Sequence, residues 1–136
     1  MDKKLAGRIK QFPEEILRIQ DALQDILNKI SASTKSGDDM QLRLIMPRLR
    51  YLKSMIDALR SDMNNVLAQI GEADSVTKQI VMQQILTLES LDGQLSGITD
   101  TISTSLKTLD ESDKRVLMAE IIKRCRDLEA AAKELK

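Results

Sequence analysis

Cys125 is the side chain in this sequence whose surroundings most resemble a reactive site. It is the only cysteine, and three basic residues lie within two positions of it. Nearby positive charge lowers the pKa of a thiol and favours the nucleophilic thiolate. However, Ile121, Cys125 and Leu128 share one helical stripe, and the sequence neighbours of a buried stripe residue point away from it. We therefore predict a buried and inert cysteine.

The acidic pairs are the next candidates for chemistry, and helix starts explain them. Glu14 and Glu15, like Asp110 and Asp113, stand where a first helical turn favours negative charge. The chain has no histidine, and it shows no phosphate-binding loop and no metal-ligand spacing. We therefore predict no catalytic, cofactor-binding or metal site, and we expect a protein that is not an enzyme.

Composition narrows the classes of partner. Lys plus Arg equals Asp plus Glu at 21 each, so the positive excess of a nucleic-acid-binding protein is missing. With one Phe, one Tyr and no Trp there are few side chains to stack on bases. No stretch approaches the ~20 apolar residues that span a bilayer, and no signal peptide is evident. A single thiol fits a reducing compartment, so we expect a cytoplasmic protein that binds neither nucleic acid nor membrane.

The element that must organise the fold is a long apolar stripe in the middle of the chain. Its spacing alternates between three and four residues, which is typical of a helix in a bundle or coiled coil. We predict a helix over about 39–70 that ends at a left-handed Gly71. Pro47 must either kink this helix or divide it, and the unbroken register favours a kink. The stripe consists of Leu42, Ile45, Leu49, Leu52, Ile56, Leu59, Met63, Val66 and Ile70.

Three further helices are predicted on the same grounds, over about 13–33, 75–109 and 112–135. Pro13 is well placed in a first helical turn, and the mixed polar residues 1–12 before it are expected to be flexible. The Ser- and Thr-rich run 31–39 predicts a loop. Short connections favour antiparallel neighbours, so we predict a single all-α domain, an antiparallel bundle of four helices with a long hairpin formed by the second and third helices.

The predicted lengths leave the tip of that hairpin without cover. The first and fourth helices are too short to reach it, and exposed apolar patches of this kind mark interaction sites. A second copy could cover the tip about a two-fold axis, or the two chains could exchange helices, so we predict a homodimer. The residues expected at this contact are Met63, Val66, Ile70, Val76 and Ile80.

Two other features leave alternatives open. Ser90, Gly93 and Gly97 are small residues at helical spacing, which permit close packing inside the bundle or a docking face for a partner helix. The methionines can fill the core or form an adaptable binding surface.

The last three helices resemble the BAG domain, a three-helix module of co-chaperones that act on the nucleotide-binding domain of the seventy-kilodalton heat-shock chaperone. The matching residues, over about 47–136, are Asp100, the pair Leu109-Asp110 and Arg115, while Lys123 stands where the family has Gln. The resemblance implies that Asp100, Asp110, Arg115 and Lys123 bind the chaperone and promote nucleotide exchange.

From these residues we expect a non-catalytic helical protein–protein interaction module, an adaptor or a self-assembling bundle. The alternative is the co-chaperone activity that the BAG resemblance implies.

Overall fold

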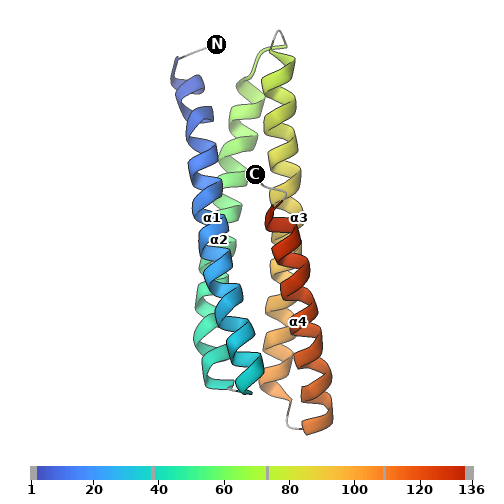
Figure 1. Ribbon diagram of the computed structural model, residues 1–136. Coiled ribbons are helices and arrows are strands. Elements are labelled where there is room, and N and C mark those ends of the chain that lie inside the picture. Colours follow the sequence, from blue (N-terminus) through green and yellow to red (C-terminus); the bar gives the residue numbers. More distant parts are fainter. Residues whose placement is uncertain (1–2, 38, 73, 109, 134–136) are drawn as a thin grey trace.

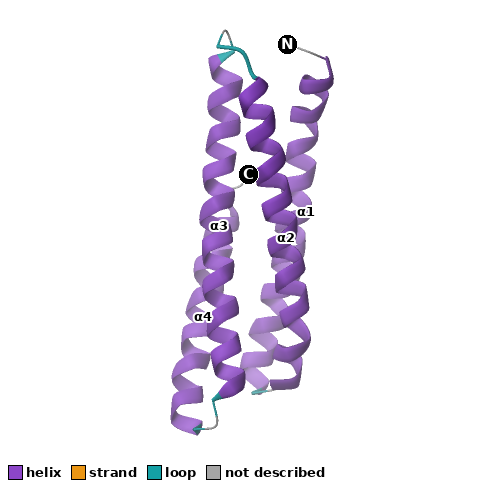
Figure 2. Ribbon diagram, turned by 180° about the vertical axis from the view of Figure 1, so that it is seen from behind, coloured by secondary structure: helices purple, strands orange, loops and turns teal. Residues whose placement is uncertain are grey.

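The computed structural model describes residues 3–37, 39–72, 74–108 and 110–133. Successive helices run antiparallel, and α4 packs back against α1, so that each helix has two neighbours (Figures 1 and 2). The predicted all-α bundle of four helices is confirmed. Its helices are α1 (Lys3–Ser36), α2 (Asp39–Gln69), α3 (Ser75–Lys107) and α4 (Glu111–Lys133).

One continuous apolar core fills the space between the four helices. All nine residues of the apolar stripe predicted for the second helix are buried, and they join the buried stripes of the other helices in a single cluster. Full burial of one Leu or Ile side chain contributes about 1.5 to 3 kcal/mol. The helices are therefore held together mainly by aliphatic packing, as the sequence predicted.

The first helix starts ten residues earlier than predicted. Residues 3–12 are helical, and α1 runs through Pro13 without interruption. A proline inside a helix costs about 3 kcal/mol because it removes one hydrogen bond and crowds the preceding turn. Burial of Leu5 and Phe12 and an ion pair between Arg8 and Asp62 of α2 oppose that cost. The prediction of a start at Pro13 after a flexible segment is therefore wrong for residues 3–12.

This longer α1 covers the hairpin tip that was expected to be open. Its first turns lie beside the end of α2, close to the α2–α3 turn (Figure 1). Met63, Val66 and Ile70 are buried within the chain, whereas Val76 and Ile80 of α3 remain exposed. The prediction of an uncovered tip is therefore wrong for Met63, Val66 and Ile70.

The end of α1 also differs from the prediction. The run 31–39 was expected to be a loop, but α1 continues to Ser36. Hydroxyl groups bond back to helix carbonyls, as Ser33 Oγ does to Lys29 O at 2.8 Å, so they support the last turns instead of ending them. The helix stops at Gly37, whose φ of 70° is the left-handed conformation that glycine adopts without strain.

Pro47 does not divide α2, which is helical on both sides of it. The division considered from the sequence is therefore excluded. Gly71 follows the last turn of α2. Among the described residues a positive φ occurs at Gly37 and not at Gly71, so the prediction of a left-handed conformation at Gly71 is wrong. A turn closed by Asp74 N donating to Gly71 O at 3.0 Å connects α2 to α3 instead.

The starts of α3 and α4 were predicted correctly. Asp74 caps α3 by accepting a hydrogen bond from the backbone N–H of Thr77. Asp110 caps α4, since its Oδ1 accepts from Ser112 N at 2.8 Å and from Asp113 N at 3.2 Å. Such caps contribute about 1 kcal/mol each.

An ion-pair cluster joins α2 to α3 beside the core. The carboxylate of Asp92, whose side chain is 13% exposed, accepts from Lys53 Nζ at 2.8 Å and from Arg60 Nη1 at 2.9 Å. The hydrogen bond to Asp92 raises the pKa of Lys53. Asp57 and Glu89 stand at the edge of the same cluster.

Candidate docking surface

A second apolar stripe runs along α2, about a third of a turn around the helix from the buried one and on the side next to α1. Tyr51 is 70% exposed, Met40 63% and Leu44 60%, values far above those of core side chains. The spacing is again three or four residues, which keeps the members on one side of the helix. At ~1.5 Å per residue the stripe is ~27 Å long. This surface, the α2 stripe, consists of Met40, Leu44, Pro47, Tyr51, Met55 and Ala58.

The α2 stripe borders a groove between α1 and α2. The part of the groove beside Pro47 and Tyr51 is a hollow of about 320 Å³, which also includes Ala22, Ile26 and Leu52 in its lining. A second hollow of about 370 Å³ follows, lined in part by Ile19, Ala58 and Leu59. Met55 lines both hollows, so the two form one groove along the helix pair.

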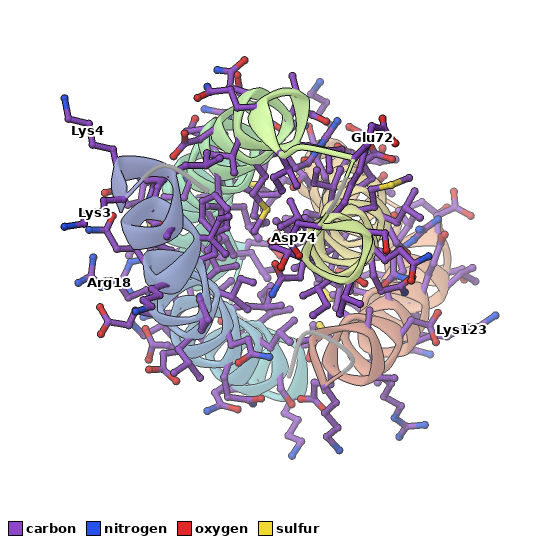
Figure 3. All side chains as sticks on the ribbon, turned by 90° about the horizontal axis from the view of Figure 1, so that it is seen from above. Lys3, Lys4, Arg18, Glu72, Asp74 and Lys123 are labelled. Carbon is purple, nitrogen blue, oxygen red and sulfur yellow. The ribbon has the colours of Figure 1, made fainter. Side chains whose placement is uncertain are left out.

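Arginines flank the α2 stripe on both sides. Helical geometry places Arg43 and Arg50, seven residues apart, on one edge and Arg48 on the other. Arg18 of α1 lines the groove and points away from the bundle (Figure 3). Within the part of the chain that the structure describes, neither Arg18 nor Arg50 forms an ion pair.

The spacing of apolar residues in the sequence also carries a signal for this surface. Met40, Leu44, Pro47, Tyr51 and Met55 have the same three-four spacing as the stripe that organises the fold. Two stripes on one helix cannot both face the same core, so one of them had to face solvent. Which one would be buried depended on the register with α1 and α3.

A smaller exposed apolar face lies on the first turns of α3, where α4 does not reach (Figure 2). Four large apolar side chains are exposed there, namely Val76, Ile80, Met82 and Leu86. Val76 and Ile80 belong to the predicted dimer contact, so the part of that contact that remains accessible is on α3. From Gln79 to Leu106 the sequence has no Lys or Arg, and this face lacks the arginines that flank the α2 stripe.

The methionines divide between the two alternatives left open by the sequence. Met46 and Met63 are buried, Met55 and Met118 are partly buried, and Met40 and Met82 are exposed. Core filling and surface exposure therefore both occur.

The residues carried over from the BAG resemblance occupy different settings. Asp110 is engaged as the helix cap, and Arg115 lines a hollow shared with the last turn of α1. Asp100 is exposed on α3, and Lys123 points away from the bundle (Figure 3). Leu109 lies outside the described residues.

Cys125 is buried on α4 between Ile121 and Leu128, as the stripe predicted. Burial raises the pKa of its thiol to about 12, and the nearby charge of Glu129 acts in the same direction. The neutral thiol is therefore the stable form, and the basic residues beside it in the sequence do not generate a thiolate.

We expect native Cys125 to react with a thiol reagent at pH 8 at least about 100-fold more slowly than the unfolded chain.

The thiol pKa is raised from 9.0 in the unfolded chain to about 12 in the fold. The contribution of the buried neutral thiol to the free energy of unfolding is therefore complete below pH 9 and is lost as the pH rises towards 12. Denaturant titrations of Cys125→Ala should lack this part of the alkaline loss, and an identical loss in both proteins would contradict the assignment.

The small residues of α3 serve packing at one position. A Cβ atom at Gly97 would lie 2.5 Å from Nη1 of Arg124, so the glycine leaves room for this guanidinium, which pairs with Glu120. Gly93 has open space beside it, and Ser90 lines a polar hollow between α3 and α4. What Gly97 admits is thus a side chain of α4 and not the backbone of another helix.

Searches of the described residues for two kinds of site found neither. No group of three or more Cys, Asp or Glu side chains is placed to hold a metal ion. No helix there has the length and apolar character needed to cross a membrane. The chain matches no protein-family model, and comparison with curated proteins and with solved structures finds no significant similarity.

Proposed function

We propose that this protein is a non-catalytic helical module that binds other proteins through the α2 stripe. The observation that carries the proposal is the row of exposed apolar side chains at helical spacing beside a groove. Soluble proteins rarely keep a contiguous apolar surface of this kind without a partner to cover it. An exposed tyrosine with apolar neighbours is also typical of the residues that dominate binding energy at interfaces.

Site-specific photo-crosslinking tests the proposal in the cell. A photoreactive amino acid at Leu44 should give discrete higher-mass adducts with protein, because the α2 stripe is the expected contact. The matched control is the same group at Val116 of α4, which is as exposed as Tyr51 but lies outside the stripe. Equal adduct formation at both positions, or none at Leu44, would contradict the proposal.

Two narrower predictions accompany it. A homodimer would form through Val76 and Ile80 on α3, and sedimentation of the protein as a monomer at high micromolar concentration would contradict this prediction.

The co-chaperone activity implied by the BAG resemblance predicts accelerated release of nucleotide from the heat-shock chaperone, and an unchanged release rate would contradict that activity.

A further inference from the structure

We infer that the partner segment of the α2 stripe is an amphipathic helix with apolar residues every three or four positions and acidic residues beside them. This inference rests on the proposed function, because it names the class of partner for the same surface. Two features of the surface carry it, namely its shape and its charge.

The groove matches inserted side chains. The hollow beside Pro47 is lined by the small side chain of Ala22 and the apolar side chains of Ile26, Leu52 and Met55. Its volume of about 320 Å³ leaves room for an aliphatic side chain from a helix laid against α1 and α2. The second hollow adjoins the first at Met55 and combines the apolar Ile19, Ala58 and Leu59 with charged side chains, so it offers a place for a second side chain further along the same helix.

The charges select an acidic partner. Arg43, Arg48 and Arg50 flank the α2 stripe, and Arg18 adds a fourth guanidinium from α1. The carboxylates that line the two hollows already have basic partners: Asp25 pairs with Lys29 at 3.0 Å and with Arg48 at 3.6 Å, and Glu15 and Asp62 pair with Arg8. Asp21 of α1 is exposed nearby. Acidic residues on both sides of the partner's apolar stripe would meet the remaining positive charge.

The same charges oppose a second copy of this chain at this surface. A two-fold contact between two α2 stripes would place arginines against arginines. The α3 face at Val76 and Ile80 lacks those arginines, so self-association would use α3 and leave α2 to a different protein.

An anionic membrane would complement the positive charge of the surface but would not fill its hollows. Amphipathic surfaces that bind lipid present an apolar face to the acyl chains without needing hollows. Here Pro47 and Tyr51 line a hollow that reaches down to the buried Leu52. That depth favours a helix with projecting side chains.

Display selection supplies the probe. A library of random 18-residue peptides is selected on the whole protein, and the enriched sequences are read. We expect net negative charge together with apolar residues at three-four spacing. Fluorescence anisotropy with one selected peptide should then show affinity that falls at least about ten-fold in the Leu44→Lys/Tyr51→Lys variant. The control Leu17→Lys/Val116→Lys, at exposed apolar positions outside both the stripe and the α3 face, should bind as the unmodified protein does.

A charge exchange tests the acidic partner separately from the apolar contact. The Arg43→Glu/Arg50→Glu variant should lose at least about ten-fold in affinity, and replacing the peptide's acidic residues by Lys should restore it. Both arginines are exposed, so circular dichroism should show an unchanged fold.

Three outcomes would overturn the inference. These are enrichment of basic or uncharged peptides, affinity that is indifferent to the Leu44 and Tyr51 changes, and binding to phosphatidylserine vesicles in place of peptides. If any of these occurs while Leu44 still crosslinks to protein in the cell, the proposed function stands and its partner is of another class. If Leu44 gives no adduct either, both fail.

Discussion

Phe12→Ala should lower the free energy of unfolding by about 3 to 5 kcal/mol. The ring is fully buried, with 0% of its surface exposed, and the guanidinium carbon of Arg8 lies 4.9 Å from its centre. Truncation removes the apolar contacts and the cation–π contact, and it leaves a cavity in the apolar core beneath the first turns of α1. A urea titration followed by circular dichroism measures the change.

Tyr51→Ala is the matched control, because Tyr51 is the only other aromatic residue and is mostly exposed. It should change stability by less than about 0.5 kcal/mol. A comparably small effect of Phe12→Ala would mean that the first turns of α1 do not pack on the hairpin, as the sequence alone had predicted.

Leu52→Ala should lower the free energy of unfolding by about 2 to 5 kcal/mol, because Leu52 is fully buried in the middle of the apolar face that α2 turns to the core. Its side chain also lines the hollow beside Pro47, so truncation deepens a groove that the surrounding helices hold open. The same titration applies, with Leu44→Ala on the exposed side of the same helix as control. Equal losses in the two variants would mean that the register of α2 has been assigned to the wrong face.

The predictable part of this fold was the part set by local pattern. The three-four spacing predicted four helices and the buried face of α2, and the predicted starts near 75 and 112 fall within one residue of the observed starts of α3 and α4. These features depend on residues within one or two turns of each other, so one sequence is enough to reveal them.

The errors arose where a distant contact outweighed a local rule. Pro13 looked like a helix start, but burial of Phe12 and the Arg8–Asp62 pair favour continuing the helix, and Asp62 lies 54 residues from Arg8 in the sequence. The hydroxyls of run 31–39 looked like loop residues until burial of Ser33 favoured the helix. The α2 stripe was hidden for the same reason, since only the packing of α1 and α3 decides which side of α2 meets solvent.

The carboxylate of Asp92 has a consequence for how α2 and α3 find their alignment. Their apolar residues repeat at similar intervals, so sliding one helix by seven residues, about 10 Å, would still bring Leu and Ile together. Lys53 and Arg60 are themselves seven residues apart, and both converge on Asp92. In the native alignment the carboxylate lies between the two, so after such a slip at most one of them would remain within reach of Asp92 and the other would lose this partner. One acidic side chain thus distinguishes the native alignment from shifted ones that the aliphatic core would tolerate.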